Sequence, residues 1–373
     1  MENTTTTSVT TSAGNGGDKL LTISDLSIVY ASKTQKLLAL DKTTLELEKN
    51  TFVAVVGESG CGKSTLALSI IGLLAIPPAK IDSGSINYKS VNLVELKENQ
   101  RRQYRGTEIA MIFQEPLTSL NPVYKVGDQI AEAILVREER KGGREIDSGV
   151  QVMQKTYRTD ATEFPSRLPR FRRGALAKIL REETLDALKR VRIADPEQVI
   201  DRYPFELSGG MRQRVMIAMA LAQKPALLIA DEPTTALDVT TQAQVLKLMK
   251  VLMDEVNTSI LLITHDLAVA SQVADRVIVM YAGDIVEDAV VYDMFSEPMH
   301  PYSKGLLSCI PSGSKDKTRL KPIPGSVPNL AVEQVGCKYA SRCPNVMNVC
   351  TTKKPRLIEV KPKHKVACFL YGE

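Results

Sequence analysis

The sequence predicts an α/β fold, in which a parallel core sheet is combined with an antiparallel β layer, a helical subdomain and a small irregular C-terminal module. A compact β-branched run at 51–56 leads into a glycine-rich turn and then into a helical pattern that extends to Leu74. Strand, loop and helix in this order form the first unit of a parallel sheet. Later apolar runs alternate with helical stretches, and prolines become frequent from Pro298 onward.

Each element follows from its own pattern of apolar residues. Residues 20–30 and 43–48 alternate apolar with other side chains, which indicates two antiparallel strands before the core unit. Short apolar runs predict further core strands at 109–113, 226–230, 260–264 and 276–281. Helical spacing predicts helices at 209–222 and 241–256, and the run 68–76 is expected to be a buried helix.

Length and composition limit the classes of protein that are possible. The chain has 373 residues, 43% hydrophobic and 24% charged, which is ordinary for a globular protein, and it contains no apolar run of about 18 residues that could cross a bilayer. We expect a disordered tail at 1–17, a main domain at 18–297 and an extension at 298–373. The net charge is +5, and the segment 137–181 contains twelve Lys or Arg but only six Asp or Glu. With few aromatic residues and no Trp, this favours a solvated insertion at 138–178 over nucleic-acid binding.

The segment 57–65 fits the phosphate-binding pattern G-x-x-x-x-G-K-[S/T]. Its glycines allow backbone N–H groups to converge on phosphate oxygens, and the N-terminus of the next helix favours negative charge. Lys63 is expected to reach the β- and γ-phosphates, and Ser64 to supply a hydroxyl to Mg²⁺. The loop residues predicted to bind ATP are Gly57, Glu58, Ser59, Gly60, Cys61, Gly62, Lys63, Ser64 and Thr65.

A second apolar run ends in two neighbouring carboxylates, Asp231 and Glu232. The carboxyl ends of parallel strands meet at one edge of a sheet, so this pair should lie beside the phosphate loop. Asp231 is predicted to assist Mg²⁺, directly or through water, and Glu232 to polarise an attacking water. The reaction class that follows is phosphoryl transfer from ATP to water.

A third motif lies shortly before this acidic strand and consists of Leu207, Ser208, Gly209, Gly210 and Met211. This LSGG segment resembles the signature of the ATP-binding cassette (ABC) ATPase family. Its serine and glycines open a helix N-terminus, which is a second cradle for an anion. The resemblance spans about 20–297, with the insertion as a gap, and implies a head-to-tail pair of cassettes in which each signature closes the partner's nucleotide site.

Other segments resemble the family in the same order along the chain. Gln114 resembles the glutamine loop that contacts Mg²⁺, water and the membrane subunits, and His265 resembles the histidine switch on the γ-phosphate. Asp238 ends a T-A-L-D segment that resembles the loop contacting the partner cassette. Tyr30 resembles the aromatic residue that stacks on adenine, with an ordinary core role as the alternative. The resemblance thus implies a catalytic set of Lys63, Gln114, Glu232 and His265, and a magnesium set of Ser64, Gln114 and Asp231.

The C-terminal extension resembles that of oligopeptide/dipeptide transporter ATPases, on segments 300–307, 323–328 and 336–343. This implies an ATPase subunit at the cytoplasmic face of the cell membrane that powers import of di- or oligopeptides, with sugar oligomers as an alternative cargo. The implied partners are a second ABC ATPase subunit in a heterodimer, two transmembrane permease subunits and, indirectly, an extracellular solute-binding protein. Met211 resembles the first of the two ATPase subunits.

Four cysteines, Cys337, Cys343, Cys350 and Cys368, lie in the extension with five, six and seventeen residues between them. Cytosolic chains rarely keep disulfides, so the group indicates a metal-binding module. Tight C-x₂₋₄-C zinc pairs are missing, and the looser spacing suits an iron–sulfur cluster on four thiolates. The resemblance also implies a [4Fe–4S] cluster, while zinc and free or disulfide-forming thiols remain alternatives.

Two other functions compete with transport. A soluble ABC ATPase acting on ribosomes or DNA usually carries two cassettes or a long coiled-coil insertion, whereas this chain has one phosphate loop and one signature. A regulatory subunit with an inactive cassette is the other alternative, and the complete set of motifs argues against it. Fold alone does not determine the cargo.

Overall fold

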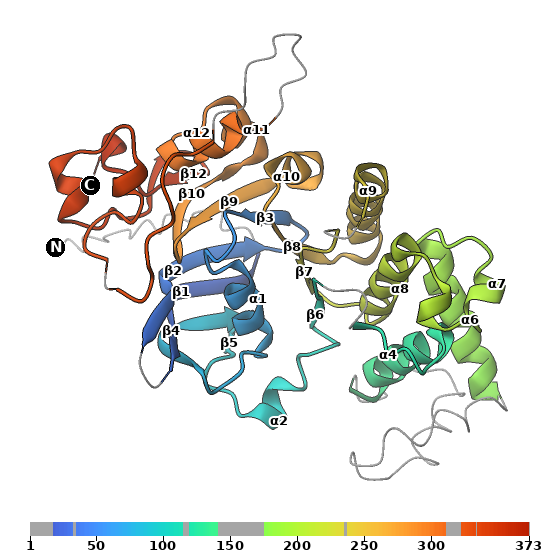
Figure 1. Ribbon diagram of the computed structural model, residues 1–373. Helices are drawn as coiled ribbons and strands as arrows, with labels where there is room; N and C mark the ends of the chain where they lie inside the picture. The colour runs from blue at the N-terminus through green and yellow to red at the C-terminus, as the bar shows by residue number, and fades with distance from the viewer. Residues whose placement is uncertain are drawn as a thin grey trace, which may run out of the picture.

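The structure, a computed structural model, describes residues 18–32, 35–114, 119–140, 175–234, 237–310, 322–332 and 334–372. Its largest element is an eight-stranded sheet with the order β11-β12-β10-β9-β3-β8-β7-β6 (Figure 1). Strands β9, β3, β8, β7 and β6 are parallel, as the sequence predicts, and β10, β12 and β11 extend the sheet in antiparallel fashion. The bounds are β3 Phe52–Val56, β6 Ile109–Ile112, β7 Leu227–Asp231, β8 Ser259–Thr264, β9 Arg276–Tyr281, β10 Asp284–Val290, β11 Ile358–Lys361 and β12 His364–Val366.

A second sheet provides the predicted antiparallel layer and has the order β2-β1-β4-β5. Its strands are β1 Lys19–Ala31, β2 Lys36–Glu48, β4 Ala79–Tyr88 and β5 Val91–Asn92. The predicted strands at 20–30 and 43–48 correspond to β1 and the second half of β2, which pair antiparallel. Strand β4 was not predicted, and it pairs antiparallel with the edge of β1 opposite β2.

Helices cover the sheet and form a separate lobe (Figure 1). Helix α1, Lys63–Ile71, follows the phosphate loop and ends at Gly72 in the left-handed region, before the end of the predicted helical run. In the lobe, α4, α6 and α8 pack on one another, and this is the predicted helical subdomain. The other α-helices within the described residues are α2 Glu98–Arg101, α4 Val126–Arg140, α6 Ala175–Arg190, α7 Pro196–Val199, α8 Gly209–Ala222, α9 Val239–Val256, α10 Leu267–Val273, α11 Val291–Ser296 and α12 Pro301–Ser308.

Strand β3 lies between two hydrophobic cores, because its side chains alternate between the faces of the sheet. Phe52, Ala54 and Val56 belong to the core that includes α8 and α9. Val53 and Val55 belong to the core shared with α1 and the antiparallel sheet. All five side chains are buried, so the chain that enters the phosphate loop is held from both sides.

The C-terminal extension begins with α12 and continues through short 3₁₀ turns, Ala340–Arg342, Asn348–Thr351 and Phe369–Tyr371, to the end of the chain. The sequence predicts a small irregular module here. Its strands β11 and β12 nevertheless join the main sheet, with Glu287 of β10 opposite Val366 of β12. The extension is therefore continuous with the sheet of the main domain.

Most of the predicted insertion, residues 141–174, lies outside the described residues, as do the predicted tail at 1–17 and the segment 235–236. Helices α4 and α6 flank this insertion on either side. Among the residues that the structure describes, no helix combines the length and the apolar character needed to cross a membrane.

Candidate nucleotide-binding and hydrolysis site

The phosphate loop follows β3 and turns sharply into α1, as predicted. Gly57 has a φ of 158°, and a Cβ atom placed on it would lie 2.2 Å from the carbonyl oxygen of Met280. Gly62 has a φ of 102°, and its Cβ would lie 2.6 Å from the carbonyl oxygen of Ala39. Separations below 3.0 Å require atoms to move. Both glycines are therefore required by the close approach of β9 and β2 to the loop.

Lys63 begins α1 and turns its side chain back into the loop. Its Nζ atom donates to the carbonyl oxygens of Gly57 at 2.8 Å and Glu58 at 3.0 Å. The side chain is 5% exposed, so its charge is directed inward. These two carbonyl oxygens hold the ammonium group inside the loop.

Two of the three predicted magnesium side chains, Ser64 and Asp231, meet at the end of β7, whereas the third, Gln114, contacts Glu232. The hydroxyl Oγ of Ser64 lies 3.3 Å from Oδ1 of Asp231 and donates to it. Burial raises the pKa of Asp231, and the charge of Glu232 adds to this effect, while the hydrogen bond from Ser64 opposes it. A buried carboxylate next to a hydroxyl has the oxygen ligands that Mg²⁺ prefers.

Glu232 brings together the other predicted catalytic side chains. The Nε2 atom of Gln114 donates to Oε2 of Glu232 at 3.0 Å, and Nδ1 of His265 lies 3.2 Å from Oε1. Glu232 has a φ of 45°, an uncommon conformation for a side-chain-bearing residue. Three residues that are far apart in the sequence therefore meet at one edge of the sheet.

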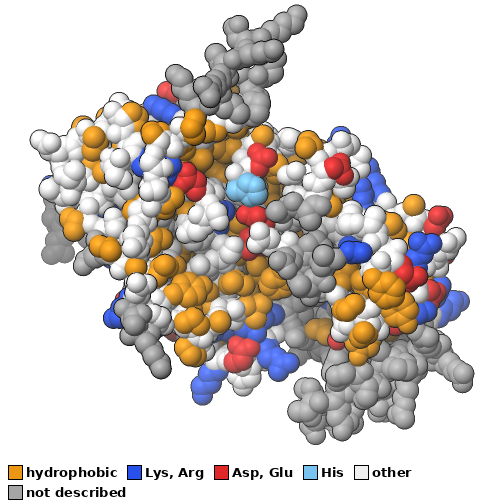
Figure 2. Space-filling view, viewed as in Figure 1, with side chains coloured by type: hydrophobic (Ala, Val, Ile, Leu, Met, Phe, Trp, Pro, Cys, Tyr) orange, Lys and Arg blue, Asp and Glu red, His pale blue; other side chains and the backbone are white. Residues whose placement is uncertain are grey.

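His265 is exposed, with 57% of its side chain accessible, whereas His300 and His364 are buried. On the face shown in Figure 2, histidine atoms lie exposed beside acidic side chains near the middle of the molecule. An exposed imidazole at the C-terminal end of β8 can reach a ligand bound at the loop. This position agrees with the predicted role of His265 more closely than with a core role.

Tyr30 lies at the margin of the same site, near the end of β1. Its hydroxyl is 3.4 Å from Oγ1 of Thr65 on α1. The side chain is partly buried and contacts the core beneath the antiparallel sheet. The structure thus places Tyr30 next to the phosphate loop and gives it a core contact as well.

The signature segment lies in the helical lobe, whereas α1 lies beside the antiparallel sheet and shares a hydrophobic core with it and the main sheet (Figure 1). Ser208 is the N-cap of α8, and its Oγ atom accepts from the N–H of Met211 at 3.3 Å. Leu207 is buried, but Ser208 and Gly209 are exposed. The N-terminus of α8 is therefore accessible to an anion.

Asp238 caps α9, and its Oδ1 atom accepts from the N–H of Thr241 at 3.0 Å. Hydrogen bonds from Thr241 lower the pKa of this fully exposed carboxylate. A Cβ placed on Gly210 would lie 3.0 Å from Cγ2 of Thr241, so the two motifs are close neighbours. Val239, the first residue of α9, is 83% exposed. The signature and the end of the T-A-L-D segment together form one accessible surface.

The four extension cysteines gather in one region but do not form a recognisable metal site. Burial raises the pKa of Cys337 to about 11, and the thiols of Cys343, Cys350 and Cys368 add to this effect. Within the described ranges, no group of three or more His, Cys, Asp or Glu side chains is placed to hold a metal ion. The geometry does not support the predicted iron–sulfur cluster.

Two residues that touch the phosphate loop were not singled out from the sequence. Tyr302 accepts a hydrogen bond from the N–H of Glu58 at 3.0 Å. Arg342 donates to both carboxylate oxygens of Glu58, at 2.8 and 3.0 Å. Both lie in segments that resemble the transporter extension, but only the folded chain places them against the loop.

The fold and site define a P-loop ATPase of the cassette type. Residues 40–235 match the family described as ABC transporter, and residues 286–350 match the family described as oligopeptide/dipeptide transporter, C-terminal region. The first match covers more than half of the chain. This protein belongs to the ATP-binding proteins of the ABC transporter family.

Relatives with similar sequences match along almost the whole chain. The chain is 45% identical to the probable peptide ABC transporter ATP-binding protein y4tR of Sinorhizobium fredii, with 95% of the chain and 96% of the relative covered. It is also 45% identical to the oligopeptide transport ATP-binding protein AppD of Bacillus subtilis, with 95% and 97% covered. Identity to the dipeptide transport ATP-binding protein DppD of Bacillus subtilis is 41%, with 95% and 96% covered.

Solved structures agree on the fold. A dimeric ATP-binding cassette, MJ0796, bound to ADP and Pi, matches with a TM-score of 0.57 and 24% identity over 73% of this chain and 98% of that one. A second cassette, cbiO1 from Clostridium perfringens, matches with a TM-score of 0.56 and 23% identity over 75% and 92%. The predicted α/β cassette architecture is confirmed.

Proposed function

We propose that this chain is the ATP-hydrolysing subunit that powers import of di- or oligopeptides through membrane permease subunits. The observation that carries the proposal is the meeting of Gln114, Glu232 and His265 beside a phosphate loop whose lysine is already directed inward. The names of the relatives and the match of the extension to the oligopeptide/dipeptide transporter family support peptides as the cargo. Sugar oligomers remain the alternative cargo.

The proposed chemistry is the transfer of the γ-phosphoryl group of ATP to water. Lys63 and the backbone N–H groups of the loop would hold the phosphates, and Ser64, Asp231 and Gln114 would surround Mg²⁺, which supplies charge neutralisation when bound. Glu232 would accept a hydrogen bond from the attacking water and orient it. His265, which contacts the same carboxylate, would bind the γ-phosphate, and Tyr30 would stack on the adenine ring.

The proposed working unit is a pair of cassettes, of which the partner is a second, non-identical ATPase subunit. The open N-terminus of α8 and the exposed Asp238 and Val239 support a partner on this surface. The signature would then close the nucleotide site of the partner. The other proposed partners are two transmembrane permeases and, indirectly, an extracellular solute-binding protein, with this chain held at the cytoplasmic face of the membrane.

The proposed division of the chain is an ATPase domain at 18–297 and an extension at 298–373. A [4Fe–4S] cluster is proposed on Cys337, Cys343, Cys350 and Cys368. The support for it is the spacing of these cysteines and the electrostatic interaction between their thiols. Binding would require deprotonation and movement of the sulfur atoms. Iron and sulfide analysis of chain purified without oxygen tests this, and an iron-free, colourless protein would overturn it.

The experiment that tests the function is an affinity purification of the tagged chain from gently solubilised native membranes, followed by mass spectrometry. We expect two polytopic permeases and a second cassette ATPase to co-purify, together with a binding protein if solute is imported. Recovery with ribosomes or DNA-repair proteins instead would contradict the proposal. A tagged variant that lacks only the tail 1–17 serves as a control for contacts made by the tail.

A further inference from the structure

Glu58, the second residue of the phosphate loop, has every polar group engaged. Its N–H donates to the hydroxyl of Tyr302 at 3.0 Å, and its carbonyl accepts from Nζ of Lys63 at 3.0 Å. Its carboxylate is held by both terminal nitrogens of Arg342, at 2.8 and 3.0 Å. Two of these three partners belong to the C-terminal extension, which starts more than 200 residues later in the chain.

Arg342 is buried and itself fixed in place, since its side chain is 4% exposed. Its Nε atom donates to the carbonyl of Pro324 at 2.9 Å, and Nη1 lies 3.3 Å from the hydroxyl of Tyr281. The guanidinium group also lies 5.7 Å from the ring centre of Tyr281 and 6.0 Å from that of Tyr339. A planar guanidinium with so many partners gives a bidentate pair of defined direction.

The His-Pro-Tyr segment at 300–302 explains how Tyr302 reaches the loop. The buried carboxylate of Glu287 accepts from the N–H groups of Met299 at 2.7 Å and His300 at 2.8 Å. Nδ1 of His300 in turn accepts from the N–H of Tyr302 at 3.1 Å and caps α12. Pro301 occupies the first turn of this helix, where proline is favoured. Each residue of the segment therefore helps to fix the tyrosine.

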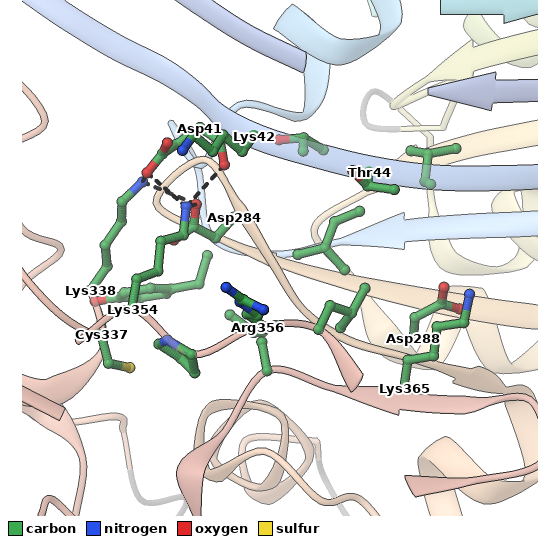
Figure 3. A pocket seen from close by; sticks show the side chains of 18 of the residues that line it. Asp41, Lys42, Thr44, Asp284, Asp288, Cys337, Lys338, Lys354, Arg356 and Lys365 are labelled. Atoms are coloured by element: carbon green, nitrogen blue, oxygen red, sulfur yellow. Dashed lines mark hydrogen bonds and ion pairs between the residues drawn. The ribbon is translucent and has the colours of Figure 1, made fainter. Parts of the chain in front are cut away.

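The extension is also held at a second place beside the loop. Nζ of Lys338 lies 3.1 Å from Oδ1 of Asp284 and 3.2 Å from Oδ2 of Asp41, and Nζ of Lys354 contacts the same two carboxylates at 2.8 and 2.7 Å. Figure 3 shows these four side chains converging at one end of a cavity of about 590 Å³ between the extension and the main domain. Each lysine contacts both aspartates, so the two positive and two negative charges of the group cancel.

This second contact reaches the phosphate loop through the turn between β9 and β10. Nζ of Lys338 donates to the carbonyl of Ala282 at 2.9 Å. The next residue, Gly283, donates its N–H to the carbonyl of Cys61 at 3.0 Å. The extension thus supports the loop directly at Glu58 and through this turn at Cys61.

We propose that Arg342 and Tyr302 are positioning residues of the nucleotide site, which hold Glu58 so that the loop keeps its phosphate-binding shape and the Glu58 carboxylate stays neutralised. The inference uses ATP binding by the loop and does not depend on the cargo. It gives the extension a part in ATP binding in addition to any contact with partners. Neither residue needs to touch ATP.

The physical reason is electrostatic as well as geometric. ATP brings several negative charges into a loop that contains a carboxylate, and like charges close together repel. Arg342 offsets the charge of Glu58 with a bidentate pair and directs the carboxylate toward the extension. Without Arg342, an uncompensated carboxylate would remain within the loop, and its repulsion would weaken nucleotide binding.

The test is the affinity of the full-length chain for the non-hydrolysable ATP analogue AMP-PNP with Mg²⁺, measured by titration calorimetry. For Arg342→Ala we expect at least about tenfold weaker binding, because one member of a charge pair is left alone in a partly buried site. Arg342→Lys should lose about threefold, because the charge remains and the bidentate geometry is lost. The double variant Arg342→Ala with Glu58→Gln should recover to within about twofold of wild type, because the unpaired charge is gone.

The matched control is Arg356→Ala, the same substitution at an exposed arginine of the extension, for which we expect unchanged affinity. If Arg342→Ala fails to fold, Arg342→Lys and Tyr302→Phe carry the test, and Tyr302→Phe should weaken binding about threefold by leaving the N–H of Glu58 without its acceptor. Wild-type affinity in folded Arg342→Ala would overturn the proposal. So would a double variant as weak as Arg342→Ala, because the loss would then not arise from the charge of Glu58.

Discussion

The Nδ1 atom of His265 lies 3.2 Å from the Oε1 atom of Glu232, although 32 residues separate them in the chain. The contact forms because β7 and β8 are parallel neighbours, so that the residues that follow them meet at one edge of the sheet. The imidazole and the carboxylate are in contact with each other. We expect the nucleotide to draw His265 toward the γ-phosphate and leave Glu232 for the attacking water.

Glu232→Gln tests the role of the carboxylate. The amide keeps the size of the side chain and its contact with Gln114, so ATP binding should be retained. Hydrolysis should fall by at least about 10²-fold, because a general base or water-orienting group contributes at this level. Phosphate release and titration with MgATP measure the two properties separately. Appreciable residual hydrolysis would refute the assigned role, and loss of binding would show that the carboxylate supports the loop instead.

The charged carboxylate of Asp231 is predicted to lower the stability of the fold, although it is needed to bind Mg²⁺. Burial raises its pKa, so the folded state takes up a proton at a higher pH than the unfolded state, and the cost of its charge is relieved as the pH falls through the raised pKa. Asp231→Asn should therefore raise the midpoint of thermal unfolding at neutral pH by about 2 °C without ligand. It should also abolish Mg²⁺-dependent hydrolysis. Scanning calorimetry without nucleotide checks the first expectation, which a lower midpoint at pH 7 would contradict.

Substitutions at two glycines, Gly209 and Gly57, are expected to affect different nucleotide sites. Gly209 is exposed, and a Cβ on it would meet only the side chain of Leu237 at 4.0 Å, so Gly209→Asp should fold and bind ATP normally. The added carboxylate would repel the phosphates bound by a partner cassette, and hydrolysis by the assembled pair should fall at least about tenfold. Gly57→Ala places a Cβ against Met280 and should reduce nucleotide binding by this chain itself. Equal turnover of Gly209→Asp and wild type in the assembled complex would contradict the proposed use of the signature.

The buried carboxylate of Glu287 is expected to stabilise the junction between the main sheet and the extension. It is fully buried and accepts from Met299, His300 and Nε2 of His364, the last at 2.8 Å. Glu287→Ala leaves these donors without an acceptor and should cost about 3 kcal/mol or more in free energy of unfolding.

The control for Glu287 is Glu297→Ala, which removes an exposed pair with Lys361 and should leave the free energy of unfolding almost unchanged. Urea unfolding followed by circular dichroism measures both variants. Equal midpoints would show that the buried carboxylate does not hold the junction.

The motifs of the nucleotide site were predictable because each depends on a few adjacent residues. A phosphate loop, a strand ending in two carboxylates and a serine-capped helix need only local sequence, and the parallel sheet then brings them together. The strand at Arg276–Tyr281 and the helix at Gly209–Ala222 were predicted with the observed bounds for the same reason. In both, the apolar pattern agrees with the local conformation.

Strands β4 and β10 were not predicted because their polar residues obscure the alternation. Strand β10 contains Glu287 and Asp288, which are buried but paired with His364 and Arg276. Local patterns give no indication that a carboxylate has a buried partner elsewhere in the chain. The pair of Glu58 and Arg342 spans 284 residues and could not be found from the sequence for the same reason.

The central claim is that hydrolysis by this chain powers peptide import, and uptake by the reconstituted complex tests it most directly. The purified complex is placed in proteoliposomes with MgATP on the side of this chain and a labelled peptide with its binding protein on the other. We expect ATP-dependent uptake that the Glu232→Gln complex loses while it still assembles. Uptake that continues in the Glu232→Gln complex, or hydrolysis in the wild type that moves no peptide, would contradict the account.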